Sequence, residues 1–236
     1  MLLKMWLFAT TFVEEVSGCK RQLFKMKKAI LVLGMHRTGT SAVAGFIHAL
    51  GACVGKNLMI PTRDNEKGYY ENLDVYNLNQ YILEKSGSSW DDIDTLELKD
   101  NFQTIIKYVI EVVFREEPVI LIKDPRICLL LPLYIEALTS LSYEIHYVRA
   151  VRNIDATVKS LVKRDGFSEA KCKVLIKKHS DSLNRSLTNR FLTIAFSDLL
   201  INTDEVVLQL QKEMPFLNYA GLARAKEFLD KSLKHH

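Results

Sequence analysis

The stretch 27–50 reads KKAILVLGMHRTGTSAVAGFIHAL, and it indicates a strand, a turn and a helix in that order. Residues 27–34 form a short, continuous apolar run that ends in a glycine, which is typical of a buried parallel strand. Residues 41–50 have a composition that favours a helix. Backbone N–H groups in such a turn point inward and meet the positive end of the helix, so residues 34–41 predict a phosphate site.

Apolar runs like the first one recur along the chain and alternate with helical patterns. Further strands are expected at 118–123, 143–148 and 191–196. Helices are expected at 74–85, 101–117, 127–140, 153–164, 169–188, 198–213 and 220–234. This alternation predicts an α/β fold in which helices flank a parallel β-sheet of the P-loop type. Because no Pro/Gly/Ser-rich linker is present, we expect a single domain over 27–236, preceded by an N-terminal extension over 1–26.

The composition of the 236 residues excludes several classes of protein. Hydrophobic residues make up 48% and charged residues 25%, which excludes disorder as the main state. The net charge of +4 is too small for a dedicated nucleic-acid-binding protein, but it is compatible with a pocket for a small anion. The four cysteines form no CxxC pair, so we expect free thiols rather than a zinc site or a disulfide scaffold.

The N-terminus bears on where the protein resides. No stretch reaches the roughly 18 consecutive apolar residues of a transmembrane helix. Residues 1–13, MLLKMWLFATTFV, are apolar but are not followed by the small-residue cleavage pattern of a secretory signal. A targeting segment, a peripheral helix and an upstream extension are the three alternatives. We expect a cytoplasmic protein with no nucleic-acid partner and no firm membrane association, and the sequence indicates no oligomeric state.

The side chains of the turn favour the binding of a terminal phosphate. The hydroxyls of Thr38, Thr40 and Ser41 can donate hydrogen bonds, and Arg37 can pair with phosphate oxygens in a bidentate way. Nucleotide triphosphatases require a Lys where this chain has Thr40, so a kinase or ATPase would lack a central cation. An ordinary glycine-containing turn without a ligand is the alternative.

The segment Arg37–Ser41 resembles the 5′-phosphosulfate loop, [KR]-S/T-G-T-[ST], of sulfotransferases that use 3′-phosphoadenosine 5′-phosphosulfate (PAPS). The second signature of that family is an Arg at a strand end followed eight residues later by a Ser, and Arg152 and Ser160 have this spacing. Three further segments resemble a mostly bacterial subgroup: 67–72, 123–126 and 160–166. The resemblance spans roughly residues 28–200, and it implies a three-layer fold with a P-loop-type sheet.

The resemblance also implies a cofactor and its contacts. PAPS would be the sulfate donor, and no metal would be needed. The 5′-phosphosulfate would be held by Arg37, Thr38, Gly39, Thr40 and Ser41. Arg152 and Ser160 would hold the 3′-phosphate. Arg149 is a rival for that contact, and a helix cap with an unrelated Arg and Ser is the alternative reading of the second motif.

Sulfuryl transfer requires a base that takes a proton from the acceptor. The family uses a His or a Glu on a segment that follows the first helix. Glu71 is the first candidate, because it lies in the part of that segment that matches the subgroup and because Tyr69 and Tyr70 can raise its pKa by partial desolvation. Asp64 is the second candidate. The alternative for Glu71 is a carboxylate that stabilises a helix start.

Lys123 closes an apolar strand, where an ammonium group can neutralise the sulfuryl and bridging oxygens, as in related sulfotransferases. A surface pair between Lys123 and Asp124 is the alternative. Arg126 is expected either to bind cofactor or substrate or to pair with Asp124. We expect His48 to pack inside the first helix, and His36 to shape the turn or line the cofactor, rather than to act as the base.

The sequence therefore predicts an enzyme that moves a sulfuryl group from PAPS to an acceptor hydroxyl on a carbohydrate, a lipid or a small metabolite. Two other functions remain open, a P-loop kinase or nucleotide hydrolase and a non-catalytic nucleotide-binding protein. The glycine-rich cationic loop that closes over the cofactor in cytosolic small-molecule sulfotransferases has no counterpart after residue 197. The acceptor is not indicated by any motif.

Overall fold

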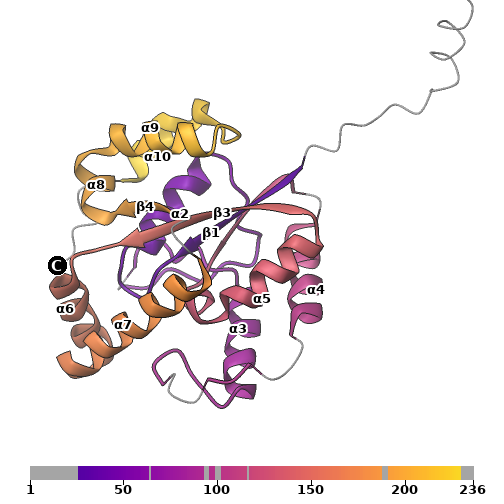
Figure 1. The fold of residues 1–236 in the computed structure, drawn as a ribbon. Helices are drawn as coiled ribbons and strands as arrows, with labels where there is room; N and C mark the ends of the chain where they lie inside the picture. Colours follow the sequence, from indigo (N-terminus) through magenta and orange to yellow (C-terminus); the bar gives the residue numbers. More distant parts are fainter. Residues whose placement is uncertain are drawn as a thin grey trace, which may run out of the picture.

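The computed structural model describes residues 26–63, 65–92, 96–98, 102–115, 117–187 and 191–229. Within these ranges, four parallel strands form one sheet in the order β2-β1-β3-β4 (Figure 1). They are β1 (Lys27–Leu33), β2 (Val119–Lys123), β3 (Tyr143–Val151) and β4 (Leu192–Ala195). The predicted α/β class and the four predicted strands are confirmed. The N-terminal extension expected at 1–26 lies outside the described residues except for Met26.

The helices follow the predicted order, with differences at their ends. They are α2 (Thr40–Ala49), α3 (Leu73–Lys85), α4 (Gln103–Phe114), α5 (Ile127–Ser140), α6 (Ile154–Asp165), α7 (Glu169–Ser186), α8 (Phe196–Ile201), α9 (Thr203–Glu213) and α10 (Leu222–Phe228). The single helix predicted over 198–213 is wrong, because the backbone leaves the helical conformation at Asn202 and divides the segment into α8 and α9. Of the helix predicted over 220–234, residues 230–234 lie outside the described part.

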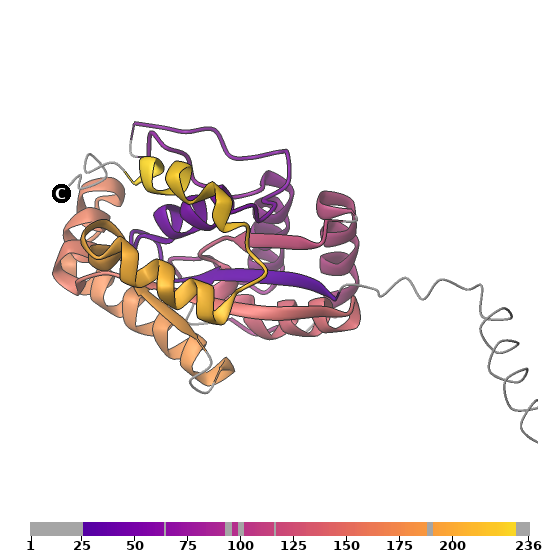
Figure 2. The ribbon, with the colours of Figure 1, turned by 90° about the horizontal axis from the view of Figure 1, so that it is seen from above.

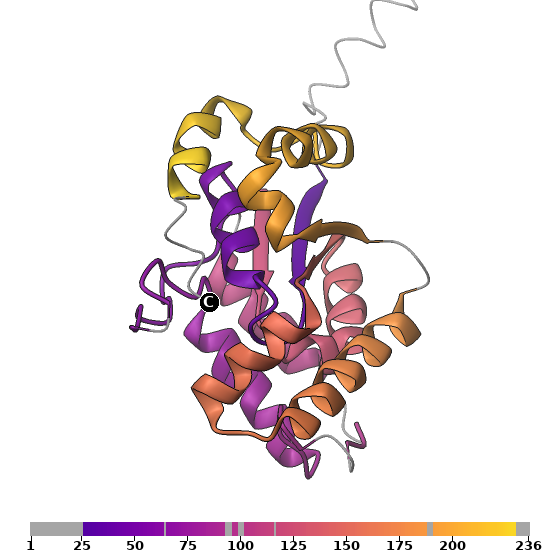
Figure 3. The same ribbon diagram turned by 90° about the vertical axis from the view of Figure 1, so that its left-hand side faces the viewer.

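The first strand shows how the sequence builds two layers of helices around the sheet. Alternate side chains of β1 point to opposite faces, and residues 29–33 are completely buried. Ala29, Leu31 and Leu33 pack in a core with α3, α4, α5 and α7. Ile30 and Val32 pack in a second core with α2, α8, α9 and α10. Figure 1 and Figure 3 show these two helix layers on opposite sides of the strands.

The strand order places a binding edge at a predictable position. The chain leaves β1 for β2 on one side, and β3 and β4 then follow on the other side of β1. In open parallel sheets, ligands bind outside the carboxyl ends of the strands at the point where the order reverses. The turn after β1 and the start of α6 after β3 both lie at this edge. No helix in the described ranges is both long and apolar enough to cross a membrane.

The connection between α2 and α3 is fixed to the sheet and to the C-terminal helix. Cys53 forms a parallel bridge with Ile120 on the edge strand β2. Farther along, the Tyr70 ring packs edge-on against the Phe228 ring of α10, with the ring centroids 5.7 Å apart. The Lys67 ammonium donates a hydrogen bond of 2.6 Å to the Phe228 carbonyl oxygen. Figure 2 shows this violet connection running beside the yellow helix α10.

We predict that Gly45→Ala destabilises the protein by about 1–3 kcal/mol, the range for an overpacked core. A Cβ atom at Gly45 would clash with Phe228 Cζ and would lie 2.7 Å from Tyr70 Cε2. Both rings would have to move, because these separations are far below van der Waals contact. Urea unfolding of the wild type and the variant measures the change. In a Phe228→Ala background the same substitution should cost less, and an equal cost in both backgrounds would contradict the contact.

Candidate active site

A cavity of about 450 Å³ opens at the carboxyl edge of the sheet, and each described strand delivers residues to it. The residues that line it are His36, Arg37, Gly39, Thr40, Ser41, Ala42, Met59, Arg63, Asn65, Glu66, Lys67, Tyr69, Glu71, Tyr76, Lys123, Pro125, Arg126, Arg152, Ser160, Lys163, Arg164 and Phe196. Eight of the predicted site residues are among them. Thr38 is the predicted site residue that does not line the cavity.

The turn after β1 presents the uncapped N-terminus of α2 to the cavity. Gly39 precedes the helix in a left-handed conformation with φ 93°, and no side chain caps the helix there. By contrast, side chains of Asn72, Asn153 and Ser168 accept hydrogen bonds from the first turns of α3, α6 and α7. The first N–H groups of a helix have no intrahelical partner, so those of α2 are available to an anion.

Local backbone geometry explains two residues of the turn. Arg37 has φ 68°, a conformation that costs a non-glycine residue free energy and that recurs at functional sites. A Cβ atom on Gly39 would lie 2.8 Å from the Phe196 ring, so the glycine permits close packing of Phe196 on the turn. The Thr38 hydroxyl donates to the Met35 carbonyl oxygen at 2.7 Å and thus stabilises the turn from inside. A direct hydroxyl contact from Thr38 to a ligand stays a prediction.

The two motifs predicted to bind phosphates meet in the structure. Arg37 Nε donates a 2.7 Å hydrogen bond to Ser160 Oγ, although the two residues are 123 positions apart. Arg152 Nη1 lies 3.5 Å from the Arg37 carbonyl oxygen, and its guanidinium covers the Phe196 ring. Burial and the nearby Arg37 charge lower the pKa of Arg152. The two guanidinium groups therefore concentrate positive potential beside the α2 N-terminus, which suits a ligand with phosphate groups.

Arg149 and His48 are engaged by other contacts. Arg149 donates from Nη1 to Asn184 Oδ1 and from Nη2 to Ser180 Oγ, so its guanidinium is engaged by α7. His48 is exposed, so the expectation that it packs in the interior is wrong, and its Nδ1 lies 2.8 Å from the Ala52 carbonyl oxygen. Asp64, the second candidate base, lies outside the described residues. Glu71 is thus the candidate base that the structure locates on the cavity.

Glu71 and Lys123 form a buried ion pair on the cavity wall. Lys123 Nζ donates to Glu71 Oε1 and also, at 3.2 Å, to Ser41 Oγ of the phosphate turn. Only 4% of Glu71 and 3% of Lys123 are exposed. Burial raises the pKa of Glu71, the Lys123 charge opposes this, and the Asp124 charge adds to it. A carboxylate with a raised pKa is suited to accept a proton near neutral pH.

The backbone around Glu71 explains how a loop residue reaches the interior. The preceding Tyr70 has φ 56°, and its ring is held by Phe228. The Met59 N–H donates to the Glu71 carbonyl oxygen at 2.8 Å. After Glu71 the chain enters α3 at Asn72, whose side chain caps the helix. Glu71 therefore does not cap the helix itself, and its carboxylate is directed to Lys123.

Asp124 organises a second buried group of polar side chains. Its Oδ1 accepts hydrogen bonds from the Arg126 N–H at 2.8 Å and from Arg126 Nη1 at 3.0 Å. Its Oδ2 accepts from Asn79 Nδ2 at 3.1 Å, and Asn79 in turn accepts from the Tyr134 hydroxyl at 2.7 Å. Asp124 is completely buried, so the alternative of a surface pair between Lys123 and Asp124 is wrong. Asp124 pairs with Arg126 instead.

Sequence reasoning understated the role of several cavity residues. His36 lines the cavity with its ring 4.4 Å from the Trp90 ring, and burial followed by the Arg164 charge lowers its pKa well below the usual value, which keeps it neutral. Tyr76 and Arg164 were not singled out individually. The segment 160–166 contained the signal for Arg164, because the resemblance already extended through it. Tyr76 had no such signal.

The cavity is strongly positive. Among the described residues, eight Lys or Arg side chains line it, against two glutamates. The whole chain has a net charge of only +4, so this lining holds more net positive charge than the chain as a whole. Within the described ranges, no group of three or more His, Cys, Asp or Glu side chains is arranged to hold a metal ion. The cavity therefore favours a small ligand that carries several negative charges.

We predict that Asp124→Asn destabilises the protein by about 3–5 kcal/mol, because it leaves the Arg126 guanidinium buried without its carboxylate. The matched control is Asp165→Asn, which removes the partner of Arg164 at a more exposed pair and should cost about 0–1 kcal/mol. Urea unfolding near neutral pH measures both changes. Equal costs for the two variants would show that Asp124 is not the centre of the buried group.

Comparisons with known proteins give similarity of overall fold. No protein-family model and no curated protein matches the chain. It is similar to the sulfotransferase domain of the olefin synthase from Synechococcus PCC 7002, with 12% identity, a TM-score of 0.49, and coverage of 79% of this chain and 72% of that one.

Two further solved structures are similar at comparable values. For the sulfotransferase domain from the curacin biosynthetic pathway, identity is 15%, the TM-score is 0.46, and coverage is 80% and 74%. For the sulfotransferase STF1 from Mycobacterium tuberculosis H37Rv, identity is 15%, the TM-score is 0.43, and coverage is 88% and 72%.

Proposed function

We propose that the protein is a PAPS-dependent sulfotransferase that acts on an acceptor hydroxyl. The observation that carries this proposal is the hydrogen bond of 2.7 Å between Arg37 Nε and Ser160 Oγ. It joins the two motifs that the resemblance to PAPS-dependent sulfotransferases assigns to the two phosphate ends of the donor, and both residues line one cavity. A turn alone could bind any phosphate, whereas two adjacent anion sites suit a bisphosphate.

The residues present fit such a donor. The uncapped N-terminus of α2 at Gly39 supplies backbone donors, and Thr40 and Ser41 line the cavity beside it. These residues and Arg37 would hold the 5′-phosphosulfate. Arg152 and Ser160 would hold the 3′-phosphate. Burial and, after it, the Arg37 charge lower the pKa of Arg152, and phosphate oxygens would offset the repulsion between the two guanidinium groups.

The catalytic roles follow from the buried pair. When bound, PAPS supplies a sulfuryl group on a phosphate leaving group. Glu71 accepts the proton of the acceptor hydroxyl, because it is a buried carboxylate with a raised pKa on the cavity wall. Lys123 stabilises negative charge that develops at the reacting centre, because its ammonium lies between Glu71 and the phosphate turn at Ser41. The Met59, Tyr69 and Tyr76 side chains provide the less polar part of the wall.

A P-loop kinase remains the second candidate, and one observation disfavours it. Thr40 stands where the phosphate-binding Lys of nucleotide triphosphatases is required. Arg37, Lys123 and Arg152, which line the cavity, would supply the positive charge at the phosphate sites instead. A non-catalytic nucleotide-binding protein would share the phosphate contacts, and it differs from the proposal only in turnover.

We predict that 3′-phosphoadenosine 5′-phosphate binds tightly in the absence of metal and that Arg37→Ala and Arg152→Ala each weaken it by about 1.5–3 kcal/mol, the range for charge-assisted hydrogen bonds. Isothermal titration calorimetry measures both effects. Arg149→Ala is the matched control, because Arg149 lies on the same strand end but is engaged by α7, and its affinity should be unchanged.

The same titration separates the proposed donor from its rivals. ATP with magnesium is the comparison ligand, and a sulfotransferase should prefer the bisphosphate. Preference for ATP with magnesium would favour the kinase. Absence of binding by either nucleotide, in protein that unfolds cooperatively, would contradict the proposed function.

We predict that Glu71→Gln preserves binding of the bisphosphate and lowers kcat by about 10²- to 10⁴-fold, the usual contribution of a general base. The base must be deprotonated to act, and burial raises its pKa above the usual 4.5. The rate should therefore rise with pH through a pKa above 4.5, and the variant should lack this acid limb. Glu66→Gln, at a second carboxylate among the described residues that line the cavity, is the control. An unchanged kcat in Glu71→Gln would exclude Glu71 as the base.

A further inference from the structure

The proposed donor leaves Arg126, a strong anion-binding group of the cavity, without a role. Arg126 lines the cavity, yet only 4% of the residue is exposed. It is the N-cap residue of α5 and directly follows Lys123, Asp124 and Pro125, so it lies close to the pair formed by Lys123 and Glu71. Its charge contributes to the lowering side of the Glu71 pKa balance, which reflects this proximity.

The Arg126 guanidinium is fixed on three sides. Nη1 donates to Asp124 Oδ1 at 3.0 Å, and Nε donates to Gln80 Oε1 at 3.2 Å. The flat face of the group covers the Tyr76 ring, with Cζ 4.3 Å from the ring centroid. These contacts hold the side chain in one orientation before any ligand arrives, so little conformational entropy would be lost on binding.

The remaining nitrogen, Nη2, is where a ligand would bind. In the described part of the chain, Arg126 Nη2 donates to no acceptor. It is also absent from the fully buried polar atoms that have no partner in that part of the chain, so it is not fully buried. Nη2 is therefore accessible from the cavity that Arg126 lines. A nearly buried, rigidly held guanidinium with an open donor favours a carboxylate, sulfate or phosphate oxygen.

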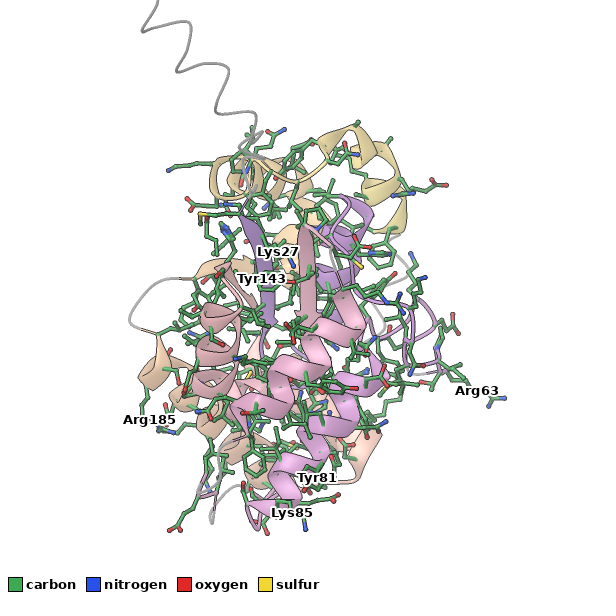
Figure 4. The ribbon with its side chains drawn as sticks, turned by 90° about the vertical axis from the view of Figure 1, so that its right-hand side faces the viewer. Lys27, Arg63, Tyr81, Lys85, Tyr143 and Arg185 are labelled. Atoms are coloured by element: carbon green, nitrogen blue, oxygen red, sulfur yellow. The ribbon has the colours of Figure 1, made fainter. Side chains whose placement is uncertain are left out.

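The charges around the cavity match those of the donor. Among its eight described Lys and Arg side chains, Arg63 points away from the protein body in Figure 4, which leaves seven. Glu66 and Glu71 line the cavity, and Asp124 and Asp165 pair with Arg126 and Arg164, so seven cations face four carboxylates among the described residues. The remaining positive charge is close to the about four negative charges that PAPS carries near neutral pH. A second anion is therefore favoured by the open donor of Arg126 and not by an excess of positive charge.

We propose that Arg126 binds an oxyanion of the acceptor, so that the acceptor is a hydroxyl compound that already carries a carboxylate, sulfate or phosphate group. This inference rests on the proposed function and specifies its substrate class. Arg126 selects the acceptor and orients its hydroxyl toward Glu71, while the Tyr76 ring stacks against the flat face of the guanidinium and holds it in place. Arg126 is a specificity-determining residue in this scheme and takes no part in holding the donor.

The test uses Arg126→Lys, which retains a positive charge beside Asp124 but lacks the planar guanidinium with its fixed N–H donors. The protein is first saturated with 3′-phosphoadenosine 5′-phosphate and then titrated with matched probes that differ in one anionic group. The pairs are 4-hydroxybenzoate and 4-hydroxybenzyl alcohol, glucuronate and glucose, and glycerol 3-phosphate and glycerol. We expect the charged member of at least one pair to bind about 10- to 100-fold more tightly, and Arg126→Lys to abolish this preference.

Two controls keep the outcomes distinct. Affinity for the bisphosphate should be the same in Arg126→Lys as in the wild type, and a loss like that expected for Arg152→Ala would assign Arg126 to the donor and overturn the inference. Tyr76→Leu leaves the pair with Asp124 intact and should weaken the charged probes several-fold. Urea unfolding verifies that both variants are folded.

The remaining outcomes separate the inference from the proposed function. Binding of the bisphosphate without preference for any charged probe, or a preference that persists in Arg126→Lys, would overturn the role of Arg126 and leave the sulfotransferase proposal intact. Failure of the wild type to bind the bisphosphate would overturn both.

Discussion

Lys123 ends a strand inside the protein, and a buried ammonium group requires an anionic partner in the fold. Glu71 is that partner, and it comes from the connection between α2 and α3, 52 positions earlier in the chain. The requirement explains why this connection is so firmly held. Bridges attach it to β2 and to itself, and Tyr70 locks it against Phe228 of α10. The C-terminal helix therefore contributes to the site without lining the cavity.

The cationic side chains on the two sides of the cavity have different partners. On the side of β2, Lys123 and Arg126 each have a buried carboxylate. On the side of β1 and β3, Arg37 contacts Ser160, and burial together with the Arg37 charge lowers the pKa of Arg152. The first arrangement fixes groups that must stay in place before a ligand arrives. The second concentrates positive potential at an uncapped helix N-terminus, where an anion from solution would be stabilised.

The sequence predicted best those features that depend on residues adjacent in the chain. The strand, turn and helix of residues 27–50 were predictable because a continuous apolar run and a glycine-containing turn are local signals. Arg152 and Ser160 were identified by their resemblance to a family signature, and the structure brings both to Arg37. Their binding of a donor stays a prediction.

Other features depend on contacts that no local pattern encodes. The Thr38 hydroxyl donates a hydrogen bond to the Met35 carbonyl oxygen within the turn, and its residue type does not predict this contact. Asp124 could pair with Lys123 or with Arg126, and only the packing of α3 and α5, which brings Asn79 and Tyr134 to it, explains the outcome. Likewise, the backbone leaves the helical conformation at Asn202 and separates α8 from α9, although the sequence pattern continues as a helix through this residue.

The buried charges of Lys123, Glu71, Asp124 and Arg126 balance one another, two cations against two carboxylates, and this balance bears on the proposed reaction. A proton accepted by Glu71 would leave one uncompensated positive charge in a nearly buried group, which disfavours the protonated base. An oxyanion on Arg126 would compensate that charge and so raise the proton affinity of Glu71. In the proposed scheme the anion of the acceptor therefore does more than position its hydroxyl. It also makes the adjacent carboxylate a stronger base at the moment when the acceptor is in place.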